Sequence, residues 1–281
     1  MEFVKKISRM QALSQQLREE GKTICFVPTM GYFHPGHLSL MHQAGKDGDV
    51  LVVSIFVNRT QFGAGEDYER YPQDIERDKR LAGKEGVDII FAPSSKEMYP
   101  EGYSTFIEVE KLSGLLCGRS RPGHFRGVAT VVSKLFNIVK PSRAYFGQKD
   151  AQQALIIKRM VNDLNLDIEI HLLPIVREED GLALSSRNEY LNPEERRAAP
   201  VLYKSLQEAR RMLNSGERNG REIVRRMEGI VKKESLAKID YISIVDGETL
   251  EDRESIEGKI LLALAVWIGK TRLIDNIIFE A

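Results

Sequence analysis

The stretch PTMGYFHPGH, residues 28–37, decides the fold that we expect for this chain. It follows a short apolar run over 23–27, which is typical of a buried parallel strand. It leads into a predicted helix that begins near Pro35. Ligands of open α/β sheets collect where a strand ends and a helix begins, and the start of a helix favours anions. His34 and His37 therefore indicate an anion site, although a Gly/Pro turn with two incidental histidines is the alternative from this stretch alone.

Short apolar runs alternate with helical stretches through the following 140 or so residues. Further strands are predicted at 50–57, 87–92, 144–146 and 166–175, with an edge or insert strand at 105–109. The predicted helices are 1–22, 36–45, 72–84, 122–139 and 151–164. This alternation predicts βαβ units and a parallel sheet. We expect an α/β protein whose N-terminal domain, residues 1–175, is a Rossmann-like, doubly wound parallel sheet.

The character of the sequence changes after residue 175. A charged loop, VREEDGLALSSRNEYLN over 176–192, is followed first by helices and then by strands. The predicted helices are 193–214 and 221–235, and the strand-like runs are 239–245, 259–268 and 272–279. Helices followed by strands predict a separate, small α+β domain. We expect residues 176–281 to form this domain and to act as a lid over the site.

Composition excludes several classes of protein. The chain has 41 basic and 41 acidic side chains, so its overall charge gives no sign of nucleic-acid binding. Its two cysteines, Cys25 and Cys117, form no CxxC motif and are too few for a disulfide framework, which predicts a reducing, cytoplasmic environment. The amphipathic N-terminus does not resemble a signal peptide, and the longest apolar run, 260–268, is too short for a membrane span.

Three further polar clusters follow predicted strands or mark the predicted domain boundary: NRTQFG from Asn58, FGQKDAQQ from 146, and LSSRN from 184. Asn58 and Gln61 offer uncharged donors and acceptors that suit hydroxyls or a carboxylate. Lys149 supplies a positive charge, and Asp150 can cap a helix or bind a ribose hydroxyl. Solvated polar loops are the alternative for each cluster.

Motifs that are missing also limit the chemistry. There is no GxGxxG, no complete Walker A motif, no GxSxG elbow and no HExxH. Two histidines without nearby cysteines make a poor zinc site, so no protein-bound metal is predicted. Covalent catalysis is not indicated either.

The motifs PTMGYFHPGH, FVNRTQFG, RPGHFRGVATVV, FGQKDAQQ and VREEDGLALSSRN, in this order and spacing, closely resemble the pantothenate synthetase (pantoate–β-alanine ligase) family. The HxGH signature is shared with the wider nucleotidyltransferase superfamily, which includes class I aminoacyl-tRNA synthetases. The resemblance covers nearly the whole chain. It implies ATP-dependent condensation of (R)-pantoate with β-alanine through pantoyl adenylate, releasing pyrophosphate and AMP, in the biosynthesis of vitamin B5 and coenzyme A. The alternatives are a nucleotidyltransferase that moves AMP or CMP onto a phosphorylated acceptor, and a non-catalytic relative.

The resemblance also implies the site. His37 is the expected general acid, acting with His34 on the ATP phosphates, and Lys149 and Arg187 are expected to neutralise pyrophosphate as it leaves. The implied ATP-binding residues are Met30, Gly31, His34, Gly36, His37, Gly147, Gln148, Lys149, Asp150, Val176, Leu184, Ser185, Ser186 and Arg187. Gly36 is expected to leave room for adenine, and the loop at 185–187 resembles the KMSKS loop of the synthetases.

The implied substrate contacts complete the set. The domain at 1–175 is expected to bind the nucleotide and pantoate, with Asn58, Gln61 and Gln153 as the pantoate ligands and Gln61 also facing β-alanine. Mg²⁺ is expected to bind through the ATP phosphates, with no tightly bound cofactor, and the chain is expected to form a homodimer. Two positions depart from the family pattern: Arg59 stands where proline is usual, and Leu184 stands where methionine is common.

Overall fold

The computed structural model describes residues 1–281 and divides into two compact units. Unit one comprises Met1–Ser113, Arg121–Gly147 and Gln153–Pro174. Unit two comprises Ile175–Ala281 together with two short segments from earlier in the chain, Gly114–Ser120 and Gln148–Gln152. The sequence-based boundary near 175 did not anticipate these two segments. That the C-terminal region acts as a lid stays a prediction.

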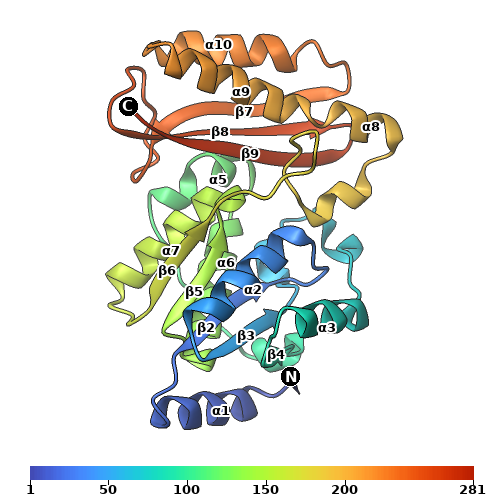
Figure 1. Ribbon diagram of the computed structural model, residues 1–281, viewed down its shortest axis with the longest axis vertical. Coiled ribbons are helices and arrows are strands. Elements are labelled where there is room, and N and C mark those ends of the chain that lie inside the picture. The colour runs from blue at the N-terminus through green and yellow to red at the C-terminus, as the bar shows by residue number, and fades with distance from the viewer. The chain divides into compact units, whose positions relative to one another are not determined.

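Unit one is built on a six-stranded parallel sheet with the strand order β1-β4-β3-β2-β5-β6 (Figure 1). The strands are β1 (Glu2–Val4), β2 (Ile24–Thr29), β3 (Val50–Ile55), β4 (Ile89–Phe91), β5 (Arg143–Gly147) and β6 (Glu169–Leu173). The order runs outward in both directions from β2, which pairs with β3 on one side and β5 on the other. Such a reversal creates the crevice where open α/β sheets bind ligands, so the loop after β2 is the expected place for a site.

Helices cover both faces of this sheet. They are α1 (Ile7–Glu19), α2 (Pro35–Asp47), α3 (Ile75–Lys84), α4 (Ser95–Met98), α6 (His124–Val139) and α7 (Ala151–Asp163). Alternate residues of β2 face opposite ways, as the strand pleat requires. Cys25 and Val27 join a buried cluster with Leu40 of α2, whereas the ring of Phe26 lies 6.4 Å from that of Phe136 on α6. The doubly wound α/β class predicted from the sequence is confirmed.

Helix α6 fixes the second loop of the site in unit one. It is 16 residues long and largely buried, and its N-cap residue Gly123 has a φ of 80°. A Cβ atom on Gly127 would lie 2.3 Å from the carbonyl oxygen of Thr60, so only glycine lets α6 approach the short helix η1 (Arg59–Gln61) this closely. No helix of the structure, α6 included, is long and apolar enough to cross a membrane.

Unit two is a three-stranded antiparallel sheet, β7-β8-β9, packed against helices. Its strands are β7 (Ala237–Asp246), β8 (Lys259–Ile268) and β9 (Thr271–Glu280), and its helices are α5 (Cys117–Ser120), α8 (Pro193–Ala198), α9 (Val201–Asn214) and α10 (Gly220–Val231). Apolar residues of α9 and α10, including Leu206 and Met227, form one buried cluster with Leu262 of the sheet. The predicted small α+β domain is confirmed in its class.

Three predicted elements are wrong in detail. The first predicted helix hides strand β1, which pairs in parallel with β4. The strand predicted at 105–109 does not form, because Ile107 N–H donates instead to Oγ1 of Thr130 on α6, at 2.9 Å. The helix predicted over 193–214 is divided into α8 and α9 by Pro200, which has no N–H to continue the helical ladder.

Candidate active site

The loop between β2 and α2 is held by side chains from two other elements. Asp78 of α3, only 1% exposed, accepts hydrogen bonds from the N–H groups of Tyr32 and Phe33, both at 2.7 Å. Gly31 has a φ of 86°, and a Cβ there would lie 3.0 Å from Asp78 Oδ2 and 2.9 Å from a methyl group of Ile55 on β3. Burial raises the pKa of Asp78. The two backbone hydrogen bonds lower this pKa but do not cancel the effect of burial. The loop is therefore fixed before it reaches the first histidine.

His34 and His37 cap the start of α2 reciprocally. Gly36 N–H donates to Nδ1 of His34 at 3.2 Å, and His34 N–H approaches Nδ1 of His37 at 3.4 Å. The two ring centroids are 4.0 Å apart. Because each Nδ1 accepts from the backbone, the proton of each neutral ring lies on Nε2. The arrangement presents two N–H donors at a helix N-terminus, where the helix dipole also favours an anion.

Gly36 is required by the histidines themselves. A Cβ at this position would lie 2.9 Å from both Cε1 and Nδ1 of His34. Any larger residue would therefore displace the His34 ring from its capping position. Whether Gly36 also makes room for adenine stays a prediction.

The loop after β3 lies beside the histidine loop. Asn58, 1% exposed, donates from Nδ2 to Oε1 of Gln61 at 3.0 Å. Gln61 in turn directs its Nε2 at the sulfur of Met30, 3.4 Å away. The first two polar clusters predicted from the sequence are thus joined by direct side-chain contacts within unit one.

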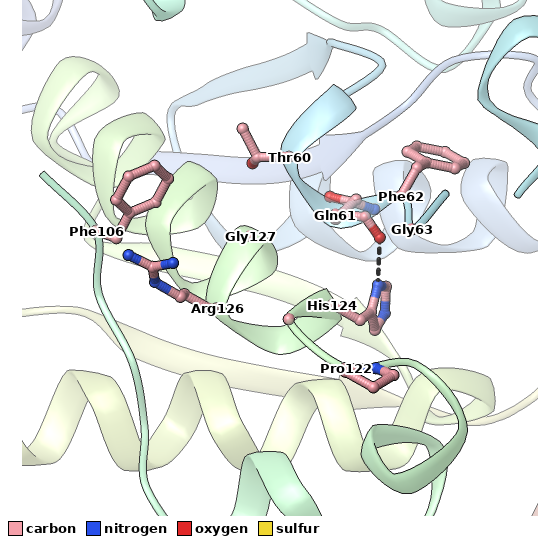
Figure 2. A pocket seen from close by; sticks show the side chains of 10 residues that line it. Thr60, Gln61, Phe62, Gly63, Phe106, Pro122, His124, Arg126 and Gly127 are labelled. Carbon is pink, nitrogen blue, oxygen red and sulfur yellow. Dashed lines mark hydrogen bonds between the residues drawn. The ribbon is translucent and has the colours of Figure 1, made fainter. Parts of the chain in front are cut away.

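A small cavity of about 150 Å³ opens next to Gln61 (Figure 2). Its walls come from the η1 loop, from Phe106 and from the start of α6, including His124 and Arg126. The guanidinium of Arg126 lies 4.1 Å from the centre of the Phe106 ring. The volume is below the roughly 300–1,000 Å³ of a drug-sized ligand site, so the cavity suits a compact ligand.

His124 and Arg121 hold the mouth of this cavity to the η1 loop. His124 Nδ1 donates to the carbonyl oxygen of Gln61 at 2.8 Å (Figure 2). Its Nε2 accepts from Arg121 at 3.0 Å. Arg121 also binds both carboxylate oxygens of Glu66, at 2.8 and 2.6 Å. Burial pushes the pKa of Glu66 up, but the hydrogen bonds and charge of Arg121 outweigh it and hold that pKa below its usual range.

In unit two, Asn276 of β9 supports the segment that carries Lys149. Its Nδ2 donates to the carbonyl oxygens of Gln148 and Lys149, at 2.9 and 3.0 Å, and its Oδ1 accepts from Gln148 Nε2 at 3.1 Å. Lys149 Nζ lies 3.4 Å from Asp150 Oδ2. The lysine is therefore held on a short, fixed 3₁₀ turn and not on a mobile loop.

The segment at 176–184 is a hairpin. Leu184 N–H donates to the carbonyl oxygen of Val176 at 3.0 Å. Arg177 binds both carboxylate oxygens of the buried Asp275, at 2.6 and 2.9 Å. Gly181, with a φ of 92°, lies so close to Tyr203 that a Cβ would come within 1.9 Å of its ring. The charged loop expected from the sequence is thus anchored, over 176–184, as a hairpin.

Two hydroxyls and a guanidinium follow the hairpin in consecutive positions. Ser185 is the N-cap of the 3₁₀ helix Ser186–Tyr190, and its Oγ accepts from Arg187 N–H at 3.3 Å. Ser186 is 8% exposed. Such a group of donors is suited to phosphate oxygens.

The whole chain is similar to proteins of one known family. The family model for pantoate-beta-alanine ligase matches residues 2–278. The chain belongs to the pantoate-beta-alanine ligase family. It is 58% identical over 281 residues to pantothenate synthetase of Caldicellulosiruptor bescii, covering 100% of both chains, and 59% identical over 278 residues to that of Thermotoga neapolitana, covering 99% of both.

Solved structures of the family agree with the fold. Pantothenate synthetase from Thermus thermophilus superposes with a TM-score of 0.94 at 46% identity, over 99% of both chains. The ligase from Francisella tularensis, in complex with beta-gamma ATP and beta-alanine, gives a TM-score of 0.80 at 36% identity, over 99% of this chain and 97% of that one.

Within this family member, the structure groups the predicted residues by unit. Unit one brings together Met30, Gly31, His34, Gly36, His37, Asn58 and Gln61, and its β5 ends at Gly147. Unit two contains Gln148, Lys149, Asp150, Val176, Leu184, Ser185, Ser186 and Arg187. Gln153 lies half-buried in α7. No group of three or more His, Cys, Asp or Glu side chains is arranged to hold a metal ion.

The two departures from the family pattern leave the local backbone intact. Arg59, in place of proline, pairs with Glu69 at 3.2 Å and lies 5.1 Å from the centre of the Tyr68 ring. The residue before it, Asn58, keeps the extended conformation (φ −87°, ψ 102°) that a following proline would require. Leu184 keeps its place in the hairpin ladder.

Sequence reasoning missed three supporting residues, namely Asp78, Arg121 and His124. The last two lie in the motif RPGHFRG, which carries part of the family resemblance but whose local pattern predicts no role for either residue. Asp78 had one usable signal: it is an acidic residue four positions before the buried Ala82 of α3, on the side of the helix that faces the core.

We expect Asp78→Asn to slow the first step of the ligation, in which pyrophosphate is released from ATP. We also expect it to lower the free energy of unfolding by about 1–3 kcal/mol, because an amide N–H₂ would face one of two buried backbone donors. Urea unfolding and single-turnover release of pyrophosphate measure the two effects. Asp74→Asn, at the exposed N-cap of the same helix, is the control and should leave turnover unchanged. Equal turnover in wild type and Asp78→Asn would show that the loop does not depend on this carboxylate.

Proposed function

We propose that this member of the family joins pantoate to β-alanine through an acyl adenylate. The ligation itself, ATP-dependent formation of an amide bond in pantothenate biosynthesis, follows from membership of the family over the full chain. In the first step a pantoate carboxylate oxygen attacks the α-phosphorus of ATP and pyrophosphate leaves. In the second step the amine of β-alanine attacks the acyl carbon, loses a proton, and AMP leaves. Both nucleophiles belong to the substrates, so the protein must supply position and charge.

The groups at the start of α2 support binding of the ATP phosphates. The Nε2–H groups of His34 and His37 are donors held in place by the backbone caps, and they add to the dipole of the helix. Lys149 and Arg187, with the hydroxyls of Ser185 and Ser186, supply the positive charge and further donors that pyrophosphate requires. Mg²⁺ enters with ATP, bound to its phosphates as part of the substrate. Asp150 is proposed to bind the ribose, and Met30 and Val176 are proposed to contact the nucleotide through their backbones.

The region around Gln61 supports the other two substrates. We place pantoate against Gln61 and Gln153, since their amides suit its hydroxyls and carboxylate. The adjacent cavity lies at the N-terminus of α6 and suits the carboxylate of β-alanine, because Arg126 in its wall carries a positive charge. Its small volume matches a compact amino acid. Bound there, β-alanine would have its amine next to the pantoate site.

The observation that carries the proposal is the ligase family match across residues 2–278, combined with the histidine pair at the first helix of the sheet. Transfer of AMP or CMP to a phosphorylated acceptor would use the same histidines, but the family and the relatives named above do not favour it. The two cysteines are buried and reduced, which supports a cytoplasmic location. A homodimer also stays a proposal, to be tested by sedimentation.

AMP release in the presence of MgATP should require both pantoate and β-alanine. Pantoate alone should give one equivalent of pyrophosphate per site and little AMP, because the pantoyl adenylate releases AMP only when the amine of β-alanine attacks it. Product analysis by chromatography, with each substrate omitted in turn, makes the measurement. AMP formation that is unaffected by omitting either substrate would contradict the ligase mechanism.

A further inference from the structure

Asn58 has no hydrogen-bonding capacity left for a substrate. Its two N–H donors go to Gln61 Oε1 at 3.0 Å and to the carbonyl oxygen of Gly127 at 3.1 Å. Its Oδ1 accepts from Thr60 Oγ1 and from the hydroxyl of Tyr99, both at 2.9 Å. An amide has two donors and two acceptor positions, and all four are used inside the protein.

These four bonds fix which way the amide of Asn58 points. Both groups on the Nδ2 side, the carbonyl of Gly127 and Oε1 of Gln61, must accept, and both hydroxyls on the Oδ1 side can donate. Because Gln61 uses Oε1 to accept from Asn58, its Nε2 is left as the donor that faces Met30 of the histidine loop. The hydrogen bond from Asn58 thus sets the orientation of the Gln61 amide.

We propose that Tyr99 is a positioning residue for pantoate: its hydroxyl fixes the amide of Asn58, which in turn fixes Gln61 as a hydrogen-bond donor in the substrate site. This deepens the proposed function, since it rests on pantoate binding at Gln61. Tyr99 acts through two side chains and does not touch the substrate itself.

The surroundings of Tyr99 suit this role. It caps the end of α4, and its ring contacts those of Phe56, with centroids 6.2 Å apart, and Tyr103, at 4.9 Å. Burial raises the pKa of Tyr99 to about 12, so its hydroxyl stays a donor through the neutral range. These two ring contacts restrict the movement of the hydroxyl, as the role of a positioning group requires.

Tyr99→Phe removes only the hydroxyl, and Tyr103→Phe is its matched control, because Tyr103 belongs to the same ring cluster and is not bonded to Asn58. We expect Tyr99→Phe to raise the KM for pantoate about five- to tenfold, the usual worth of one buried hydrogen bond, while the KM for ATP stays the same. Tyr103→Phe should change neither constant. A role confined to folding would not separate the two KM values.

The Gln61→Ala background tests whether the effect passes through Gln61. There, Tyr99→Phe should raise the pantoate KM no further, because the group it positions is already gone. If Gln61→Ala alone leaves the pantoate KM unchanged, pantoate does not bind at Gln61, and both that placement and the present proposal fail. If Gln61→Ala raises the KM but Tyr99→Phe does not, or raises both KM values equally, the placement stands and the role of Tyr99 is overturned.

Discussion

His37→Ala is expected to lower the rate of adenylate formation by roughly 10²–10³-fold, the usual cost of removing one fixed donor from a developing negative charge. The stability cost should be small, because the backbone bond that its Nδ1 accepts is long, at 3.4 Å. Single-turnover release of pyrophosphate from enzyme saturated with MgATP and pantoate measures the rate. Thermal unfolding measures the fold separately.

His42→Ala is the matched control, since His42 lies on the same helix and points its exposed ring at Glu85, 3.7 Å away. It should release pyrophosphate at the wild-type rate. His37→Gln adds a second comparison, because its amide can donate a hydrogen bond but cannot supply a proton as a general acid. Partial recovery in His37→Gln would assign His37 as a donor, and none would favour proton transfer. An unchanged rate in His37→Ala would remove His37 from the mechanism.

The sequence was sufficient to predict where the histidine pair lies in the fold, because the pair follows a strand and begins a helix, where local pattern is informative. His34 and His37 stand at the helix start that follows a continuous apolar strand, a position that favours an anion. The sheet was also predictable, since buried parallel strands are continuous apolar runs. Strand β1 was missed because three residues, one of them charged, make too short a run to recognise.

The supporting groups could not be predicted, because each acts on a residue far away in the sequence. Asp78 holds the backbone of Phe33 from 45 positions away, and Tyr99 reaches Asn58 from 41 positions away. Within its own segment each reads as an ordinary surface acid or core aromatic. Asn58 also reads as a substrate ligand until the structure shows all four of its hydrogen bonds directed into the protein. Only tertiary contacts decide between such roles.

Lys149→Ala is expected to slow adenylate formation by about 10²–10³-fold while leaving the second half-reaction near the wild-type rate. The charge of Lys149 is proposed to neutralise pyrophosphate, which leaves only in the first step. Supplying chemically prepared pantoyl adenylate with β-alanine bypasses that step, and release of AMP then reports the second step alone. Stability should change little, because Asn276 holds this turn through backbone carbonyl groups that the substitution keeps.

Two comparisons make the Lys149 result specific. Lys158→Ala removes an exposed lysine from α7, the helix that follows the turn, and should leave both half-reactions unchanged. Lys149→Arg keeps the charge but replaces a compact ammonium with a planar guanidinium, so it should recover only part of the lost rate. Equal losses in both half-reactions of Lys149→Ala would mean that the lysine holds the adenylate itself, since pyrophosphate is absent from the second. A selective loss in the first assigns its charge to the leaving group.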